Sequence, residues 1–183
     1  MISKAEELNG KYPGIEWHFI GPLQSNKASP LVKHVGKNLK CVETVSTLKL
    51  AQKLDRAVED LIKSQECDDT YRLSIFLQID TSGEETKSGV DAQHAPSLAA
   101  EIVSKCPHLS LEGVMTIGAP GDFSCFDALV DCRKDVAEAL SCPPERLELS
   151  MGMSGDFEEA IRRGATNVRV GSTIFGERDY SKK

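Results

Sequence analysis

Two kinds of apolar pattern alternate along this chain. Short apolar runs predict strands that begin near residues 16, 40, 73, 111, 147 and 168. Between these runs, apolar residues recur every three or four positions, which is the spacing of a helix with one buried face. The longest such stretch follows Ser46, a plausible N-cap, and its apolar positions are Leu50, Ala51, Leu54, Ala57, Val58, Leu61 and Ile62. Six strands alternating with five helices predict a parallel sheet with helices outside it.

The most informative stretch is the C-terminal LELSMGMSGDFEEAIRRGATNVRVGSTIFGER. A strand begins at Leu147, and the small polar residues 152–156 predict a turn into a short helix that Asp156 can cap. The following strand carries Arg169 between two valines, and a second small turn is expected at 171–173. Small turns at the ends of two consecutive strands offer backbone N–H groups and hydroxyls to one anion.

This stretch therefore predicts a phosphate site. In barrels of alternating strands and helices, a phosphate commonly binds in the loops after the last two strands, where these turns are expected. The alternative is an ordinary strand-helix-strand unit whose small residues serve only to make tight turns, and spacing alone leaves both interpretations open.

Composition limits the classes of function. With 183 residues, 40% hydrophobic, 27% charged and a net charge of −6, the chain is expected to form one globular domain over residues 1–183. The basic residues are scattered, which argues against nucleic acid or an anionic membrane as partner. No apolar run has the length of a membrane span, and MISKAEELNGK lacks the apolar stretch of a secretory signal, so a cytoplasmic location is expected.

The cysteines are expected to be reduced and structural. They show no Cys-x-x-Cys pair and no histidine at ligand spacing, so neither a zinc site nor a disulfide framework is indicated. Two of them share one face of a predicted helix with apolar residues, which favours packing over redox chemistry. The six are Cys41, Cys67, Cys106, Cys125, Cys132 and Cys142.

Four segments resemble one known family. They are WHFIGPLQSNK near the start, IDTSGEETKSGV at 79–90, LEGVMTIGAP at 111–120, and LSMGMSGDFEEAIRRGATNVRVGSTIFGER. Together they resemble the pyridoxal-phosphate homeostasis proteins, a family similar to the N-terminal barrel of alanine racemase. The resemblance implies a (β/α)8 barrel of the TIM type that carries pyridoxal phosphate, shows little or no turnover, and serves cofactor supply.

The six predicted strands are fewer than the eight of a closed barrel. The resemblance implies that the family's first two strand-helix units, which precede the segment matching residues 17–27, have no counterpart here. The family's pyridoxal-bearing lysine lies on the first of those strands, so no residue of this chain corresponds to it, and Lys4 does not qualify. Family members often have histidine where this chain has Pro22, which puts a cofactor role of that position in doubt.

By match to the family, the cofactor site is expected at Met153, Ser154, Gly155, Arg169, Gly171 and Ser172. The two serines and two glycines would hold the phosphate, and Arg169 would face the pyridine nitrogen. An arginine there discourages protonation of the ring, which favours holding the cofactor over using it. An alternative from the residues alone is a rim arginine paired with Glu148 or Glu177.

The predicted function is pyridoxal-phosphate binding for cofactor homeostasis, without catalysis. One alternative is an amino-acid racemase or another pyridoxal-dependent enzyme, which needs a Schiff-base lysine and a second acid/base. Lys27 and Lys87 lie in polar loops, where a lysine keeps its water and is poorly suited to that role. A second alternative is an interaction protein that binds no cofactor. The protein is expected to be a monomer, or to associate weakly through the open edges of its sheet.

Overall fold

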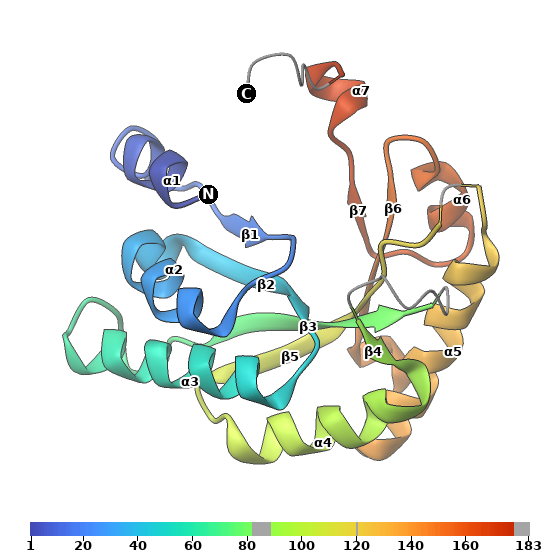
Figure 1. Cartoon of the computed structure of the whole chain (residues 1–183), viewed down its shortest axis with the longest axis horizontal. Helices are drawn as coiled ribbons and strands as arrows, with labels where there is room; N and C mark the ends of the chain where they lie inside the picture. Colours follow the sequence, from blue (N-terminus) through green and yellow to red (C-terminus); the bar gives the residue numbers. More distant parts are fainter. Residues whose placement is uncertain (82–88, 120, 178–183) are drawn as a thin grey trace.

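The structure is a computed structural model that describes residues 1–81, 89–119 and 121–177. Lys87 and most of the polar loop expected after residue 80 lie outside these ranges. Within the described part, the strands and helices alternate in sequence as the apolar pattern predicts, and Figure 1 shows them as a curved sheet with helices along its outer side.

The sheet is parallel throughout the described residues. Its strands follow one another in the order β1-β2-β3-β5-β6-β7, and each pair of neighbours among these strands is parallel. A two-residue strand, β4, pairs with the end of β3 and was not predicted, because two residues carry no periodic signal. The strands are β1 Trp17–Phe19, β2 Leu39–Val45, β3 Leu73–Asp80, β4 Val90–Asp91, β5 Leu109–Met115, β6 Glu148–Met153 and β7 Asn167–Arg169.

The helices connect successive strands on the outside of this sheet. Thr47, not Ser46, is the N-cap of α3, because Thr47 directly precedes the helix and its side chain accepts the N–H of Leu50 at 3.2 Å. The second small turn, expected at 171–173, instead opens a one-turn helix, α7. The helices are α1 Ile2–Leu8, α2 Ala28–Val35, α3 Leu48–Lys63, α4 Ala95–Lys105, α5 Ser124–Ala139, α6 Phe157–Arg162 and α7 Ser172–Phe175.

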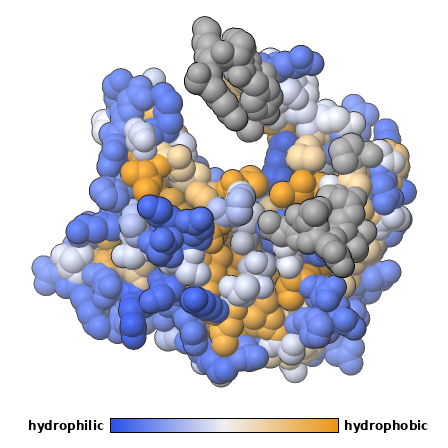
Figure 2. Space-filling model, in the orientation of Figure 1, coloured by the Kyte–Doolittle hydropathy of each residue, from blue (hydrophilic) through white to orange (hydrophobic). Residues whose placement is uncertain are grey.

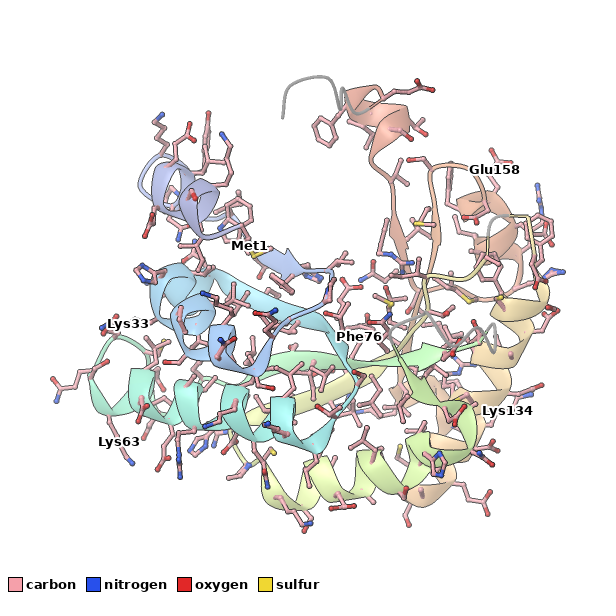
Figure 3. All side chains as sticks on the ribbon, in the orientation of Figure 1. Met1, Lys33, Lys63, Phe76, Lys134 and Glu158 are labelled. Atoms are coloured by element: carbon pink, nitrogen blue, oxygen red, sulfur yellow. The ribbon has the colours of Figure 1, made fainter. Side chains whose placement is uncertain are left out.

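Two apolar clusters lie on opposite faces of the sheet. The larger one fills the space between the strands and the outer helices, and includes Val42 of β2 and Leu54 of α3. The smaller one consists of Cys41, Phe76 and Met115, from three neighbouring strands, and Phe76 is labelled near the middle of the sheet in Figure 3. The sheet is therefore buried on both faces, as expected of parallel strands in a barrel-type fold.

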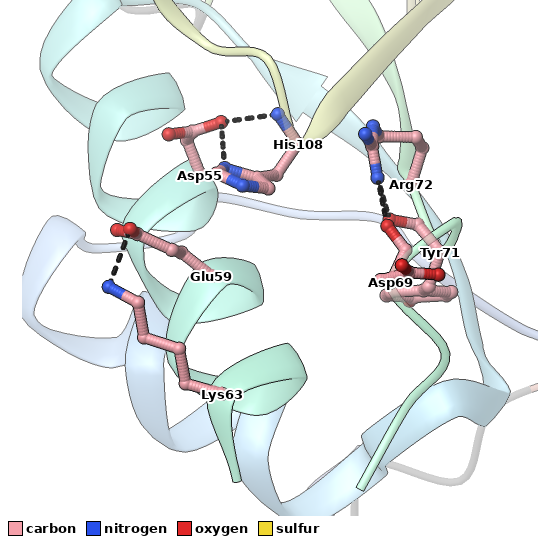
Figure 4. A network of polar contacts seen from close by, with 7 residues as sticks. All are labelled: Asp55, Glu59, Lys63, Asp69, Tyr71, Arg72 and His108. Atoms are coloured by element: carbon pink, nitrogen blue, oxygen red, sulfur yellow. Dashed lines mark hydrogen bonds and ion pairs between the residues drawn. The ribbon is translucent and has the colours of Figure 1, made fainter. Parts of the chain in front are cut away.

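Hydrogen bonds connect the residues just before β3 and β5 to neighbouring elements. Just before β5, His108 donates its backbone N–H to Asp55 of α3 at 2.8 Å, and its ring nitrogen lies 3.2 Å from the same carboxylate oxygen (Figure 4). Before β3, the Tyr71 hydroxyl donates to the carbonyl of Leu39. Polar groups at this end of such a sheet stabilise the fold, whereas ligands bind at the C-terminal ends of the strands.

The sheet does not close within the described residues, so β1 and β7 form its two edges. Figure 2 shows the molecule hollowed between the end that carries α1 and the end that carries α7. Beside β1, an open groove of ≈460 Å³ is lined mainly by apolar residues that include Met1, Phe19 and Leu23. The predicted fold class, an incomplete (β/α) barrel with six main parallel strands, is confirmed.

Candidate functional site

The two small turns at the C-terminal ends of β6 and β7 lie together. Ser154 Oγ accepts the backbone N–H of Gly171 at 2.9 Å and that of Thr173 at 3.4 Å. This contact joins the turn before α6 to the first residues of α7. The structure thus brings Ser154, Gly171 and Ser172 into one small region of exposed and half-buried loop.

A glycine sets the path of the first turn. Gly152, in β6, has φ of +90°, which side chains rarely adopt, and a Cβ there would lie 2.6 Å from Cβ of Ala160 in α6. Only a residue without Cβ lets α6 approach the strand this closely. The position of Ser154, two residues further on, therefore depends on local backbone geometry that the sequence specifies.

Asp156 is the N-cap residue of α6, but its side chain does not cap the helix. Its Oδ1 accepts the backbone N–H of Met153 at 2.6 Å and so closes the turn back onto β6. Met153, one of the expected cofactor residues, is the last residue of β6, and because its N–H donates to Asp156 it is not free to bind a ligand.

These turns also present backbone N–H groups that are not used in the turn itself. Within the described ranges, the backbone N–H groups of Ser154, Gly155 and Ser172 donate to no protein acceptor. On the α6 side, the ≈370 Å³ depression next to Ser154 is lined by three carboxylates, those of Asp156, Glu158 and Glu159, and by one cation, Arg162, so its charged side chains carry a net negative charge. An anion is disfavoured there by charge repulsion, so the side facing Gly171 is the candidate anion site.

Arg169 ends β7 and reaches across the C-terminal ends of two neighbouring strands. Its NH1 donates to Ser150 Oγ of β6 at 2.9 Å, and its NH2 donates to the carbonyl of Thr116, just after β5, at 2.8 Å. Burial lowers the pKa of Arg169, and the nearby carboxylates of Glu43 and Asp156 oppose this. The expected alternative pairing with Glu148 or Glu177 is not present in the part of the chain that the structure describes.

Ser150 links this arginine to a buried carboxylate. Its hydroxyl lies 2.6 Å from Oε2 of Glu43, which is on β2, 1% exposed and on the far side of β3 and β5 in the sheet order. The second oxygen of Glu43 lies 2.8 Å from Nδ1 of His18 on β1. The concave face is thus crossed by a chain of polar contacts from one edge strand to the other.

The charges of Glu43 and His18 follow from the contacts that these two side chains make. Burial raises the pKa of Glu43, but the hydrogen bonds with His18 and Ser150 outweigh it, and the net effect is a lowered pKa. The hydrogen bond to Glu43 raises the pKa of His18, with burial acting against it. Glu43 is therefore a carboxylate at neutral pH.

Sequence reasoning did not identify Glu43, Ser150 or His18 as site residues. Glu43 is one of three polar residues in the run Leu39–Val45, with Lys40 and Thr44, and a charge at a buried position of a strand is an available signal. The sequence signal at Ser150 is weaker, because a serine between two apolar residues fits any strand that is polar on one face.

The lysines that the structure describes are all at the surface. Every lysine in the described ranges is exposed, including Lys27, and Figure 3 shows Lys33, Lys63 and Lys134 on outer helices. Among the same residues, no cluster of three or more histidine, cysteine or acidic side chains is arranged to hold a metal ion. Nor does that part of the chain contain a helix both long and apolar enough to span a bilayer.

The cysteines of the described ranges are unpaired thiols, and four of them are buried. Burial raises the pKa of Cys106 to about 11 and that of Cys132 to about 12. Thiols with such values are protonated near neutral pH and react poorly as nucleophiles, which agrees with a packing role.

The fold and the paired loops define a protein of the alanine racemase N-terminal-domain type, and the model of that family matches residues 3–179. Among curated proteins, the pyridoxal phosphate homeostasis protein of Bos taurus is 46% identical over 100% of this chain and 67% of its own length. The protein of that name from Homo sapiens is 44% identical over 93% of this chain and 62% of its own length. The chain belongs to this family of pyridoxal phosphate homeostasis proteins, and it spans about two thirds of the length of these relatives.

Solved structures give the same placement. PipY of Synechococcus elongatus, with PLP bound, has a TM-score of 0.74 and 28% identity, and the match covers 96% of this chain and 79% of PipY. The structure of PipY without PLP has a TM-score of 0.76 and 29% identity over the same shares of both chains.

Proposed function

We propose that this chain binds pyridoxal 5'-phosphate and serves intracellular homeostasis of that cofactor without turning over a substrate. The observation that carries this proposal is the contact of Ser154 with Gly171, which joins two loops with free N–H donors near the inward-facing Arg169. The relatives named for pyridoxal phosphate homeostasis, and the PLP bound in PipY, support it.

The residues present fit the two ends of this cofactor. The Ser154 hydroxyl and the N–H groups of Gly155 and Ser172 suit a phosphate dianion, and Gly171 holds the two loops together. Arg169 uses two of its five N–H donors within the protein, which leaves others to face a ring nitrogen.

The charge of Arg169 agrees with a protein that binds the cofactor without using it in catalysis. Bound pyridoxal phosphate would supply an electron-withdrawing ring, whose power depends on protonation of its nitrogen. The guanidinium of Arg169 opposes that protonation, because it would face a second positive charge. The exposed lysines of the described ranges lack the desolvation that activates an amine for covalent catalysis. Lys87, Lys182 and Lys183 lie outside those ranges.

The test is a titration of the purified chain with pyridoxal phosphate, followed by absorbance and by competition with inorganic phosphate. Saturable binding with an absorbance change, reversed by phosphate, is expected. Arg169→Gln should alter the absorbance and affinity of the bound cofactor while phosphate still competes. If the folded chain gives no saturable signal and phosphate does not bind, the cofactor proposal is wrong and the alternative of an interaction protein stands.

A further inference from the structure

A continuous chain of hydrogen bonds connects Arg169 to the surface at His18. Its members come from β7, β6, β2 and β1, and the contacts are 2.9 Å from Arg169 to Ser150, 2.6 Å from Ser150 to Glu43, and 2.8 Å from Glu43 to His18. Ser150 and Glu43 are 0% and 1% exposed, whereas the His18 side chain is 37% exposed. The chain therefore begins at the proposed ring site and ends in solvent.

The chemistry of the groups fixes the direction of each bond. A guanidinium can only donate and a carboxylate can only accept, so the single hydrogen of Ser150 must point to Glu43 and its lone pair to Arg169. For the same reason, His18 must carry a hydrogen on Nδ1 and donate it to Glu43. Ionised Glu43 thus determines how Ser150 presents an acceptor to the arginine.

We propose that Glu43, acting through Ser150, is a positioning residue that orients Arg169 toward the pyridine ring of the cofactor, and that His18 makes this orientation responsive to protons. The inference rests on the proposed function, because it concerns the same site. It assigns no contact between Glu43 and the ligand.

The cost of burying Glu43 supports a specific role. Its neighbour on the inner face is Cys41 of the apolar cluster with Phe76 and Met115, and a carboxylate beside such a cluster loses its hydration. The hydrogen bonds from His18 and Ser150 and the charge of Arg169 offset that loss. The arginine and the carboxylate therefore depend on each other, and changing one alters the position of the other.

Protonation of His18 changes the charge at the outer end of the chain. The titratable groups that act on its ring are Glu43 of β2, Glu16 just before β1 and Glu148 of β6. All three are carboxylates, and Arg169 is the cation at the other end of the chain. Near neutral pH the imidazole is the member whose ionisation changes, so the charge of the His18, Glu43 and Arg169 set goes from +1 to 0 as pH rises.

The test compares two ligands that differ in the ring. Glu43→Gln leaves one accepting oxygen for two donors, and Ser150→Ala removes the acceptor for Arg169 while its bond to the Thr116 main chain remains. Both variants should bind pyridoxal phosphate about tenfold more weakly and alter its absorbance, with unchanged affinity for inorganic phosphate. His18→Asn keeps an N–H donor near the Nδ1 position, so it should retain affinity at high pH but lose the pH dependence of affinity that the parent is expected to show as His18 ionises.

The controls separate this inference from the proposed function. Ser154→Ala should weaken the binding of both pyridoxal phosphate and inorganic phosphate, because Ser154 lies at the part of the site that holds the phosphate group. If Glu43→Gln and Ser150→Ala bind pyridoxal phosphate with the parent's affinity and absorbance, the positioning role is overturned while the proposed function stands. If these two variants lower the affinity for pyridoxal phosphate and for inorganic phosphate equally, Glu43 only supports the fold, and the inference is again overturned. If the parent binds neither ligand, the proposed function fails and the inference fails with it.

Discussion

Ser154 Oγ lies 2.9 Å from the backbone nitrogen of Gly171, which joins the turn after β6 to the turn after β7. The hydroxyl accepts in this contact, so its own hydrogen is free to be donated to a ligand. The N–H of Gly171, which was expected to face the phosphate, is used inside the protein. The donors left for an anion are therefore the Ser154 hydroxyl and the N–H groups of Gly155 and Ser172.

Replacing Ser154 by alanine should weaken the binding of both pyridoxal phosphate and inorganic phosphate. The variant loses one hydrogen bond to a charged ligand, worth about 1.5 to 3 kcal/mol, so affinity should fall about tenfold or more. It also removes the bond that joins the two loops. Titration by absorbance or calorimetry measures this, with Ser97→Ala on the exposed side of α4 as the matched control. Equal affinities for parent and Ser154→Ala would show that the turns are structural only.

Gly152→Ala should destabilise the protein, whereas Gly155→Ala in the same turn should not. The first variant places a methyl group 2.6 Å from Ala160 and requires φ of +90°, which together cost about 1 to 3 kcal/mol. Around Gly155 a Cβ meets nothing within 4 Å, so the change should stay within about 0.5 kcal/mol. Urea unfolding of both variants gives the comparison. Similar losses in the two variants would contradict the close approach of α6 to β6.

The periodic part of the fold could be predicted from the sequence. The strand expected to begin near residue 73 begins at Leu73 in the structure, because a parallel strand that packs on both faces is apolar at most of its positions. β4 and α7 were not predicted, since two and four residues are too short to show a period. The cap of α3 was misplaced by one residue, because Ser46 and Thr47 are both good caps in sequence and only backbone geometry selects between them.

Only the part of the candidate site that is formed by residues close together in the sequence could be predicted. The small residues of the two turns indicated that Ser154 and Gly171 would meet, since consecutive parallel strands end on the same side of a sheet. The contact of Glu43 with Ser150 joins residues 107 positions apart, and it depends on how strongly the sheet curves. No local pattern encodes that curvature, so the partner of Arg169 could not be named from the sequence.

Pyridoxal phosphate should bind this chain without stable covalent attachment to Lys27 or to any other lysine of the described ranges. Each of these side chains is exposed, so none has the desolvation that makes a lysine a good nucleophile near neutral pH. Borohydride treatment of the loaded protein, followed by peptide mass spectrometry, should give little and scattered pyridoxyl label. Stoichiometric label on one described lysine would refute this and would favour the enzyme alternative.

The pH dependence of stability should reveal the contact between His18 and Glu43. The hydrogen bond to Glu43 raises the pKa of His18 above 6.5, so its stabilising contribution is complete below pH 6.5 and is lost as pH rises through the folded-state value. The free energy of unfolding of the parent should therefore decline over that window relative to His18→Asn, which has no titrating ring. Glu43→Gln should remove the same slope, because it takes away the carboxylate that favours the charged imidazole. Urea unfolding at a series of pH values measures all three proteins, and parallel curves for the parent and His18→Asn would show that the 2.8 Å contact does not influence the ionisation of His18.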